Sequence, residues 1–212
     1  MTQDVPTIAR HTSAERRRAL LGMWVLVGSL AIFFTASMLL YVAYIALRTG
    51  ITPEADQLFV VPRVFWVSTA LLLAISGLLH WALIAARRDE FFDVTIRTGG
   101  ALLAALLFLV VQADAMYALL VETQSLKNTS ISPYPYTMIL ALLHALHVVA
   151  GVISLCVIVV QTFLQRFDHE SQLGLELCGL YWHFLDLVWL VMLASFYAAG
   201  SVYNRDAVPL LP

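Results

Sequence analysis

The feature that most constrains this chain is a series of five long apolar runs, each near or above the length needed to cross a bilayer. A transmembrane helix needs about 20 consecutive apolar residues. Backbone N–H and C=O groups find no water inside lipid, so such runs must satisfy them internally as helices. The runs do not alternate apolar with polar residues, which argues against a membrane β-barrel. The predicted spans cover residues 20–47, 64–86, 99–121, 136–164 and 177–200.

Composition indicates the same fold class, an all-α integral membrane bundle of five transmembrane helices. Hydrophobic residues make up 61% of the chain and charged residues only 12%, whereas a soluble domain is about one quarter charged. The net charge of -2 comes with no basic stripe, so nucleic acid is not an expected partner. The first run is far longer than the roughly 7–15 apolar residues of a signal peptide, so we expect a retained span. The predicted segments are an N-terminal cytoplasmic stretch (1–19), the membrane domain (20–200) and an external tail (201–212).

The distribution of Lys and Arg predicts the orientation, because cytoplasmic loops carry an excess of these residues. One side would hold eight of them: Arg10, Arg16, Arg17, Arg18, Arg87, Arg88, Arg97 and Arg166. The other side would hold four: Arg48, Arg63, Lys127 and Arg205. We therefore expect the N-terminus inside and the C-terminus outside.

The last run carries ionisable side chains that are costly inside a membrane and need partners. His183 and Asp186 are three residues apart, and Glu176 precedes His183 by seven, so all three lie on one edge of a helix. That edge must face protein. A proton-handling or ligand site is one interpretation, but a hydrogen-bonded polar seam between helices is favoured, since buried polar groups need partners in any case.

Four other residues also place polar groups within the predicted spans. His144 and His147 share one face of the fourth run, and hydrogen bonding between helices is favoured over metal or haem ligation, because no complementary ligand spacing appears. Asp114 has no partner that the sequence identifies. His80 lies beside Trp81 and is expected to be an interfacial anchor.

The same residues carry a family resemblance. The last run, from Glu176 through Tyr181-Trp182-His183-Phe184 and Asp186 to Val188-Trp189, resembles the final helix of cytochrome c oxidase subunit III, whose pattern is close to E-x4-Y-W-H-F-x-D-x-V-W. The stretch His144, His147, Val148 and Gly151 resembles another helix of this family, with Ala145 in place of the usual glycine. Pro62 and Gln112 also fall at positions expected for the family. Five spans match the short bacterial form. Two acidic positions of the family are replaced, by Leu30 and by Ala115.

The resemblance implies a non-catalytic accessory subunit of a haem-copper terminal oxidase in aerobic respiration, located in the cell inner membrane. It implies no catalytic, cofactor-binding or metal-binding residues in this chain. Haem and copper would reside in the partner catalytic subunit I, with subunit II and bound phospholipid as further partners. The expected polar seam comprises His144, His147, Glu176, Tyr181, Trp182, His183, Asp186 and Trp189, with Gln112, Asp114 and His80 as additional candidates.

Three alternatives stay open at this point. The first is a subunit III-like protein of a nitric oxide reductase. The second is a dihaem b-type anchor that oxidises quinol. The third is a free-standing transporter or channel, in which the seam would line a substrate path.

Overall fold

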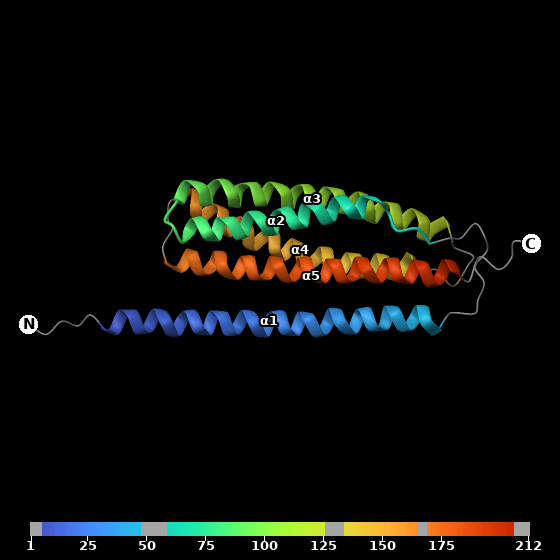
Figure 1. The fold of residues 1–212 in the computed structure, drawn as a ribbon, viewed down its shortest axis with the longest axis horizontal. Helices are drawn as coiled ribbons and strands as arrows, with labels where there is room; N and C mark the ends of the chain where they lie inside the picture. The colour runs from blue at the N-terminus through green and yellow to red at the C-terminus, as the bar shows by residue number, and fades with distance from the viewer. Residues whose placement is uncertain (1–5, 48–58, 126–133, 165–168, 206–212) are drawn as a thin grey trace, which may run out of the picture.

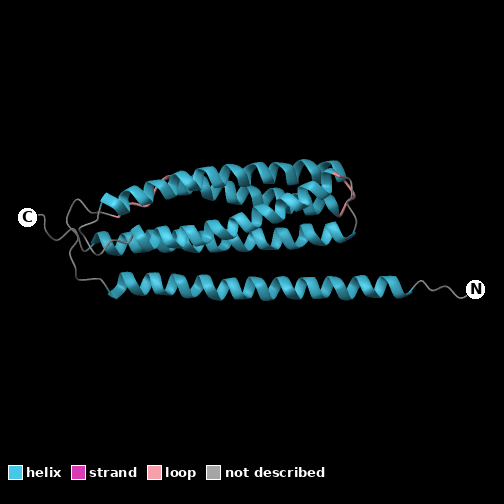
Figure 2. Ribbon diagram, turned by 180° about the vertical axis from the view of Figure 1, so that it is seen from behind, coloured by secondary structure: helices cyan, strands magenta, loops and turns pink. Residues whose placement is uncertain are grey.

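A computed structural model describes residues 6–47, 59–125, 134–164 and 169–205. All the secondary structure of these residues is helical (Figure 2). The helices are α1 (Pro6–Leu47), α2 (Val64–Ala86), α3 (Phe91–Ser125), α4 (Tyr134–Phe163) and α5 (His169–Arg205). Each contains a segment long and apolar enough to cross a membrane, which confirms the predicted fold class. Several residues used in the sequence argument lie outside the described ranges: Arg48, Lys127, Arg166 and the tail from residue 206.

Helices α2 and α3 form an antiparallel hairpin whose connection is well defined. The Glu90 N–H donates to the Ala85 carbonyl over 3.1 Å, and the Asp89 N–H donates to the Ala86 carbonyl over 3.3 Å. This pattern requires a left-handed residue just after the helix. Asp89 fills that position with φ 58°, a conformation that Asp tolerates better than most residues.

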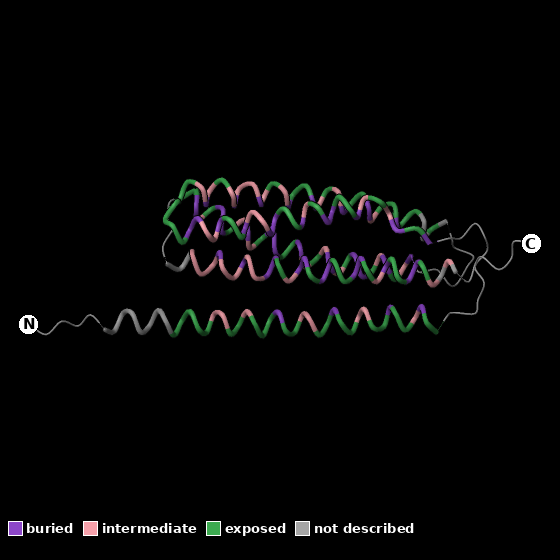
Figure 3. The backbone as a smooth tube through the Cα atoms, viewed as in Figure 1, coloured by how far each residue is buried: buried purple, intermediate pink, exposed green. Residues whose placement is uncertain are grey.

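Helices α2, α3, α4 and α5 pack into a compact group, and α1 lies beside α4 and α5 (Figure 1). The core side chains of α2 recur at helical spacing, at Phe65, Leu72, Ile75 and Leu79, each at most 1% exposed. Much of α1 is exposed, with burial limited to one side (Figure 3). The predicted membrane bundle therefore consists of a four-helix core with α1 against one flank.

Candidate functional site

The predicted polar residues are distributed over three helix contacts. The structure does not place them in a single seam between α4 and α5. Glu176 points to α1, where Arg16 Nη2 donates to both carboxylate oxygens, at 2.8 and 3.1 Å. The side chains of this pair are 54% and 30% exposed, Arg16 first. Glu176 thus joins α5 to α1, although the sequence had placed it with His183.

His183 and Asp186 lie against α2. The Ser76 hydroxyl is 2.9 Å from His183 Nδ1, and the same hydroxyl interacts with the Asp186 carboxyl. Asp186 is 7% exposed, and its Oδ1 has no hydrogen-bond partner among the described residues. The His80 and His183 rings lie 6.4 Å apart, centroid to centroid. His80 therefore belongs to this group, although the sequence had predicted only an interfacial position beside Trp81. His183 itself is exposed on the outer surface of the bundle.

His144 is completely buried between aromatic rings. Its centroid lies 5.2 Å from Trp189 and 6.2 Å from Phe34. Within the described part of the chain, neither ring nitrogen has a hydrogen-bond partner. The neighbouring Trp189 donates its indole N–H to Thr69 Oγ1 over 2.9 Å. His144 therefore marks a polar position inside an aromatic layer between α1, α4 and α5.

His147, one turn away on α4, is bound differently. Its Nδ1 lies 2.7 Å from the Leu143 carbonyl of its own helix. The Tyr181 hydroxyl donates to the His147 carbonyl over 3.0 Å, which links α5 to α4. The Phe34 ring of α1 packs edge-on at 5.1 Å. The two histidines share a face, as predicted, but they make no common site.

The remaining candidates differ in burial. Gln112 is 2% exposed and accepts a hydrogen bond from Ser68 over 3.1 Å, while its Nε2 has no partner among the described residues. Asp114 is exposed on α3. Trp182 is fully buried against Gly151, where an added Cβ would lie 3.2 Å from two ring atoms. The contact between Trp182 and Gly151 brings α4 and α5 close together.

Sequence reasoning missed the hydroxyl residues of α2. Ser68, Thr69 and Ser76 are the partners of Gln112, Trp189 and His183 respectively. Their recurrence at positions 68, 69 and 76 is the signal that could have identified them, since 69 and 76 lie two turns apart on one face. Ser and Thr in membrane helices often bond their own backbone instead, as Thr69 also does with the Phe65 carbonyl.

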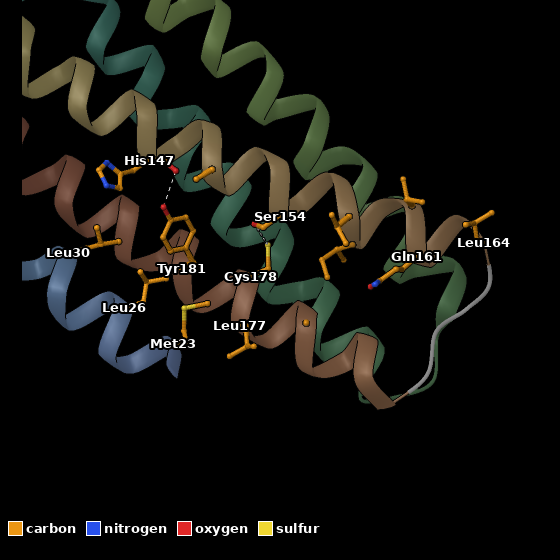
Figure 4. Close-up of a pocket in the computed structure, with 15 residues that line it drawn as sticks. Met23, Leu26, Leu30, His147, Ser154, Gln161, Leu164, Leu177, Cys178 and Tyr181 are labelled. Atoms are coloured by element: carbon orange, nitrogen blue, oxygen red, sulfur yellow. Dashed lines mark hydrogen bonds between the residues drawn. The ribbon is translucent and has the colours of Figure 1, made fainter. Parts of the chain in front are cut away.

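An apolar groove of about 1080 Å³ lies between α1, α4 and α5 (Figure 4). Its α1 wall includes Met23, Leu26 and Leu30, its α4 wall His147, Ser154 and Gln161, and its α5 wall Leu177, Cys178 and Tyr181. The few polar groups on it are largely engaged within the protein, such as the Ser154 hydroxyl, which donates to the Gly151 carbonyl over 2.7 Å. We call this surface the α1–α4–α5 groove. A lining of this kind suits a hydrocarbon chain more than a polar ligand.

Among the described residues, no three His, Cys, Asp or Glu side chains gather in an arrangement that could hold a metal ion.

Comparison with known proteins agrees with the family resemblance found in the sequence. The sequence model of the family described as cytochrome c oxidase subunit III matches residues 2–201. The chain is 25% identical over 195 residues to cytochrome c oxidase subunit 3 of Bacillus sp. (strain PS3), covering 91% of each chain. It is 23% identical over 192 residues to cytochrome bo(3) ubiquinol oxidase subunit 3 of Pseudomonas aeruginosa, covering 91% of this chain and 90% of that one.

The human relative differs in length. Cytochrome c oxidase subunit 3 of Homo sapiens is 30% identical over 157 residues, which is 72% of this chain and 55% of the human one. This chain therefore spans about half the length of that relative.

Proposed function

The chain belongs to the cytochrome c oxidase subunit III family, whose members are non-catalytic subunits of haem-copper oxidases, and from this we propose that it stabilises the catalytic subunit of such an oxidase. The observation that carries the proposal is the family match over residues 2–201, which covers four membrane-spanning segments in full and all but the last residue of the fifth. A member of this family works in a complex with other oxidase subunits.

The haem and copper of that complex would be held by the catalytic subunit, with a second subunit completing the assembly. This chain would act as a buttress in the cell inner membrane, with its N-terminus inside. The orientation is supported by the excess of arginines at the start of α1 and at the α2–α3 turn. The relatives are named as oxidase subunits, so the nitric oxide reductase, b-cytochrome and transporter alternatives are not favoured.

Purification of the intact complex through a tag on this chain tests the proposal. In mild detergent, a larger multi-helix subunit should co-purify, and the absorption spectrum should show haem. After that partner is dissociated, this chain should carry no haem absorbance. A chain that purifies alone from cells expressing the oxidase, or one that retains haem after dissociation, would count against the proposal.

Bound phospholipid forms the second part of the proposed role. The α1–α4–α5 groove is apolar and large enough for acyl-chain segments. Near its Met23 end, Arg16 lies two turns away on α1, with Arg17 and Arg18 exposed beside it. A lipid seated there would place its chain in the groove and its phosphate near these guanidinium groups.

Native mass spectrometry of the purified complex can count such a lipid. Replacing Ala150, which lines the groove, by Trp should remove one phospholipid per chain. The matched control Ala113→Trp, at an exposed position of α3, should leave the count unchanged. An equal lipid count for both variants would refute this assignment of the groove.

A further inference from the structure

The exposed side chain of His183 lies near the middle of the membrane-spanning part of the bundle. Ser76 is the thirteenth of the 23 residues of α2. A helix of this length spans about 34 Å, close to the roughly 30 Å of a hydrocarbon core. Because Ser76 bonds to His183 over 2.9 Å, the His183 ring lies at the same depth. An exposed imidazole therefore sits near the midplane.

Such a position is unfavourable in contact with lipid. Ionisable residues at this depth almost always face protein or a water-filled cavity, and they pair with other polar groups. Asp186, one turn further along α5, is buried inside this chain and out of reach of an external partner. It is 7% exposed, and its Oδ1 has no partner among the described residues. Acyl chains offer no hydrogen bond to the exposed His183 ring.

The surface around these groups has the form of a helix-packing face. Its α2 residues are Trp66, Ala70, Leu73, Gly77 and His80, and its α5 residues are His183, Leu187, Leu190, Ala194 and Tyr197. We call these ten residues the α2–α5 face. Both sets follow the alternating four- and three-residue spacing that places side chains on one stripe of a helix.

The two ends of the α2–α5 face are fixed by contacts between the helices. At one end the Trp66 indole N–H donates to the Tyr197 hydroxyl over 2.7 Å. At the other the His80 and His183 rings approach to 6.4 Å. Three small residues (Ala70, Gly77 and Ala194) and three leucines lie between them, and a Cβ added to Gly77 would meet no atom within 4 Å. Small residues allow the backbone of another membrane helix to approach closely.

The outward surfaces of α1 and α3 make no comparable demand at mid-depth, and the half-buried His147 of the α1–α4–α5 groove bonds the Leu143 carbonyl of its own helix. Residues 21–47 of α1 contain no charged or histidine side chain. Asp114 of α3 is exposed, but it lies two residues beyond Gln112, which bonds to Ser68 near the start of α2. That position is close to the end of the span, where headgroups and water are within reach. The α2–α5 face is therefore the outward surface that most needs protein cover.

We propose that a transmembrane helix of the oxidase catalytic subunit packs along the α2–α5 face and hydrogen-bonds the exposed His183 ring near the middle of the membrane. This inference rests on the proposed function and adds the surface through which this chain acts. The partner helix would present a small residue opposite Gly77 and a hydroxyl, amide or other polar side chain at the level of the His183 ring, whose Nδ1 already bonds Ser76. The contact would complete the hydrogen bonding that this chain leaves unsatisfied.

Site-specific photocrosslinking in the tagged complex tests the surface directly. A benzophenone amino acid would replace Leu187 on the α2–α5 face, and in separate samples Leu40 of α1 or Val110 of α3, which are 61%, 72% and 69% exposed respectively. The catalytic subunit should be captured from position 187, with much weaker capture from 40 and 110. Capture from 40 or 110 in preference to 187, or capture of a second copy of this chain or of lipid alone at 187, would overturn the inference. The catalytic subunit would still co-purify in these cases, which leaves the proposed function standing.

A pair of glycine variants gives an independent measurement. Gly77→Leu adds bulk to the α2–α5 face, whereas Gly28→Leu adds the same bulk to α1, and neither added Cβ meets an atom within 4 Å of this chain. Gly77→Leu should lower the amount of catalytic subunit recovered per tagged chain by roughly five- to thirty-fold, the range that corresponds to losing one or two helix-packing interactions. Gly28→Leu should leave recovery unchanged. Equal recovery for both variants would contradict the assigned face, and failure of the wild-type chain to recover the catalytic subunit would contradict the proposed function itself.

Discussion

The close approach of α4 and α5 at Gly151 yields a quantitative prediction. A Cβ at this position would lie 3.2 Å from Cε2 and Cζ2 of Trp182 and 3.4 Å from Cδ1 of Leu185. Both neighbours are fully buried, so neither can move without displacing others. Gly151→Val adds this Cβ and two methyl groups, and overpacking of this kind costs about 1–3 kcal/mol. The better helix propensity of Val returns only about 0.4 kcal/mol.

The expected net loss is about 0.6–2.6 kcal/mol, which corresponds to a fall in melting temperature of about 1–10 °C for a chain of this size. Thermal unfolding in detergent can be followed with a thiol-reactive fluorophore in a Cys156→Ala background, because Cys156 is only partly buried whereas Cys178 is buried and becomes reactive on unfolding. Gly28→Val is the matched control, since an added Cβ there meets no atom within 4 Å. A melting temperature for Gly151→Val equal to that of the control would refute the described packing of α4 on α5.

Three further predictions use the same unfolding assay. Thr69→Val removes the acceptor of the buried Trp189 indole N–H at nearly constant volume and should cost about 1–3 kcal/mol, whereas an unchanged melting temperature would show that this hydrogen bond is absent. Glu176→Gln breaks a partly exposed ion pair with Arg16 and should cost at most about 1 kcal/mol, with the difference vanishing in high salt; a larger, salt-independent loss would contradict this. Asp89→Gly relieves the left-handed backbone at φ 58° and should stabilise the chain by up to about 1 kcal/mol, so a destabilised variant would mean that the Asp side chain is needed at the turn.

The number and type of helices could be predicted from the sequence, because the absence of water in a bilayer leaves few alternatives for long apolar runs. The ends were predicted well only where local chemistry fixes them. Helix α2 has the predicted bounds of 64–86, since Pro62 precedes it and the Asp89 turn follows it. Helix α1 begins at Pro6, within the segment predicted to be cytoplasmic, because a helix can continue into water once its backbone hydrogen bonds are propagated.

The side-chain partners could be predicted only in part. Spacing correctly placed His183 and Asp186 on one edge, and both meet Ser76. Spacing could not identify the partner of Glu176, since the seven-residue separation from His183 is equally compatible with an outward contact to Arg16 of α1. The choice between these contacts depends on where α1 packs. Arg16 and Glu176 are 160 positions apart in the sequence, and the periodicity of α5 contains no information on a contact of that range.

The two flanks of α5 differ in a way that bears on the function of the chain. Toward α1, α5 is joined by the Arg16–Glu176 pair at one end and by the Tyr41–Phe196 ring contact at the other, with centroids 5.7 Å apart. Between these contacts lies the α1–α4–α5 groove, whose apolar lining an acyl chain can satisfy. Toward α2, α5 instead presents the exposed His183 ring, to which an acyl chain offers no hydrogen bond. One helix therefore separates a flank suited to lipid from a flank suited to protein. A subunit of this family could hold a partner through the second flank while the first remains in contact with the bilayer.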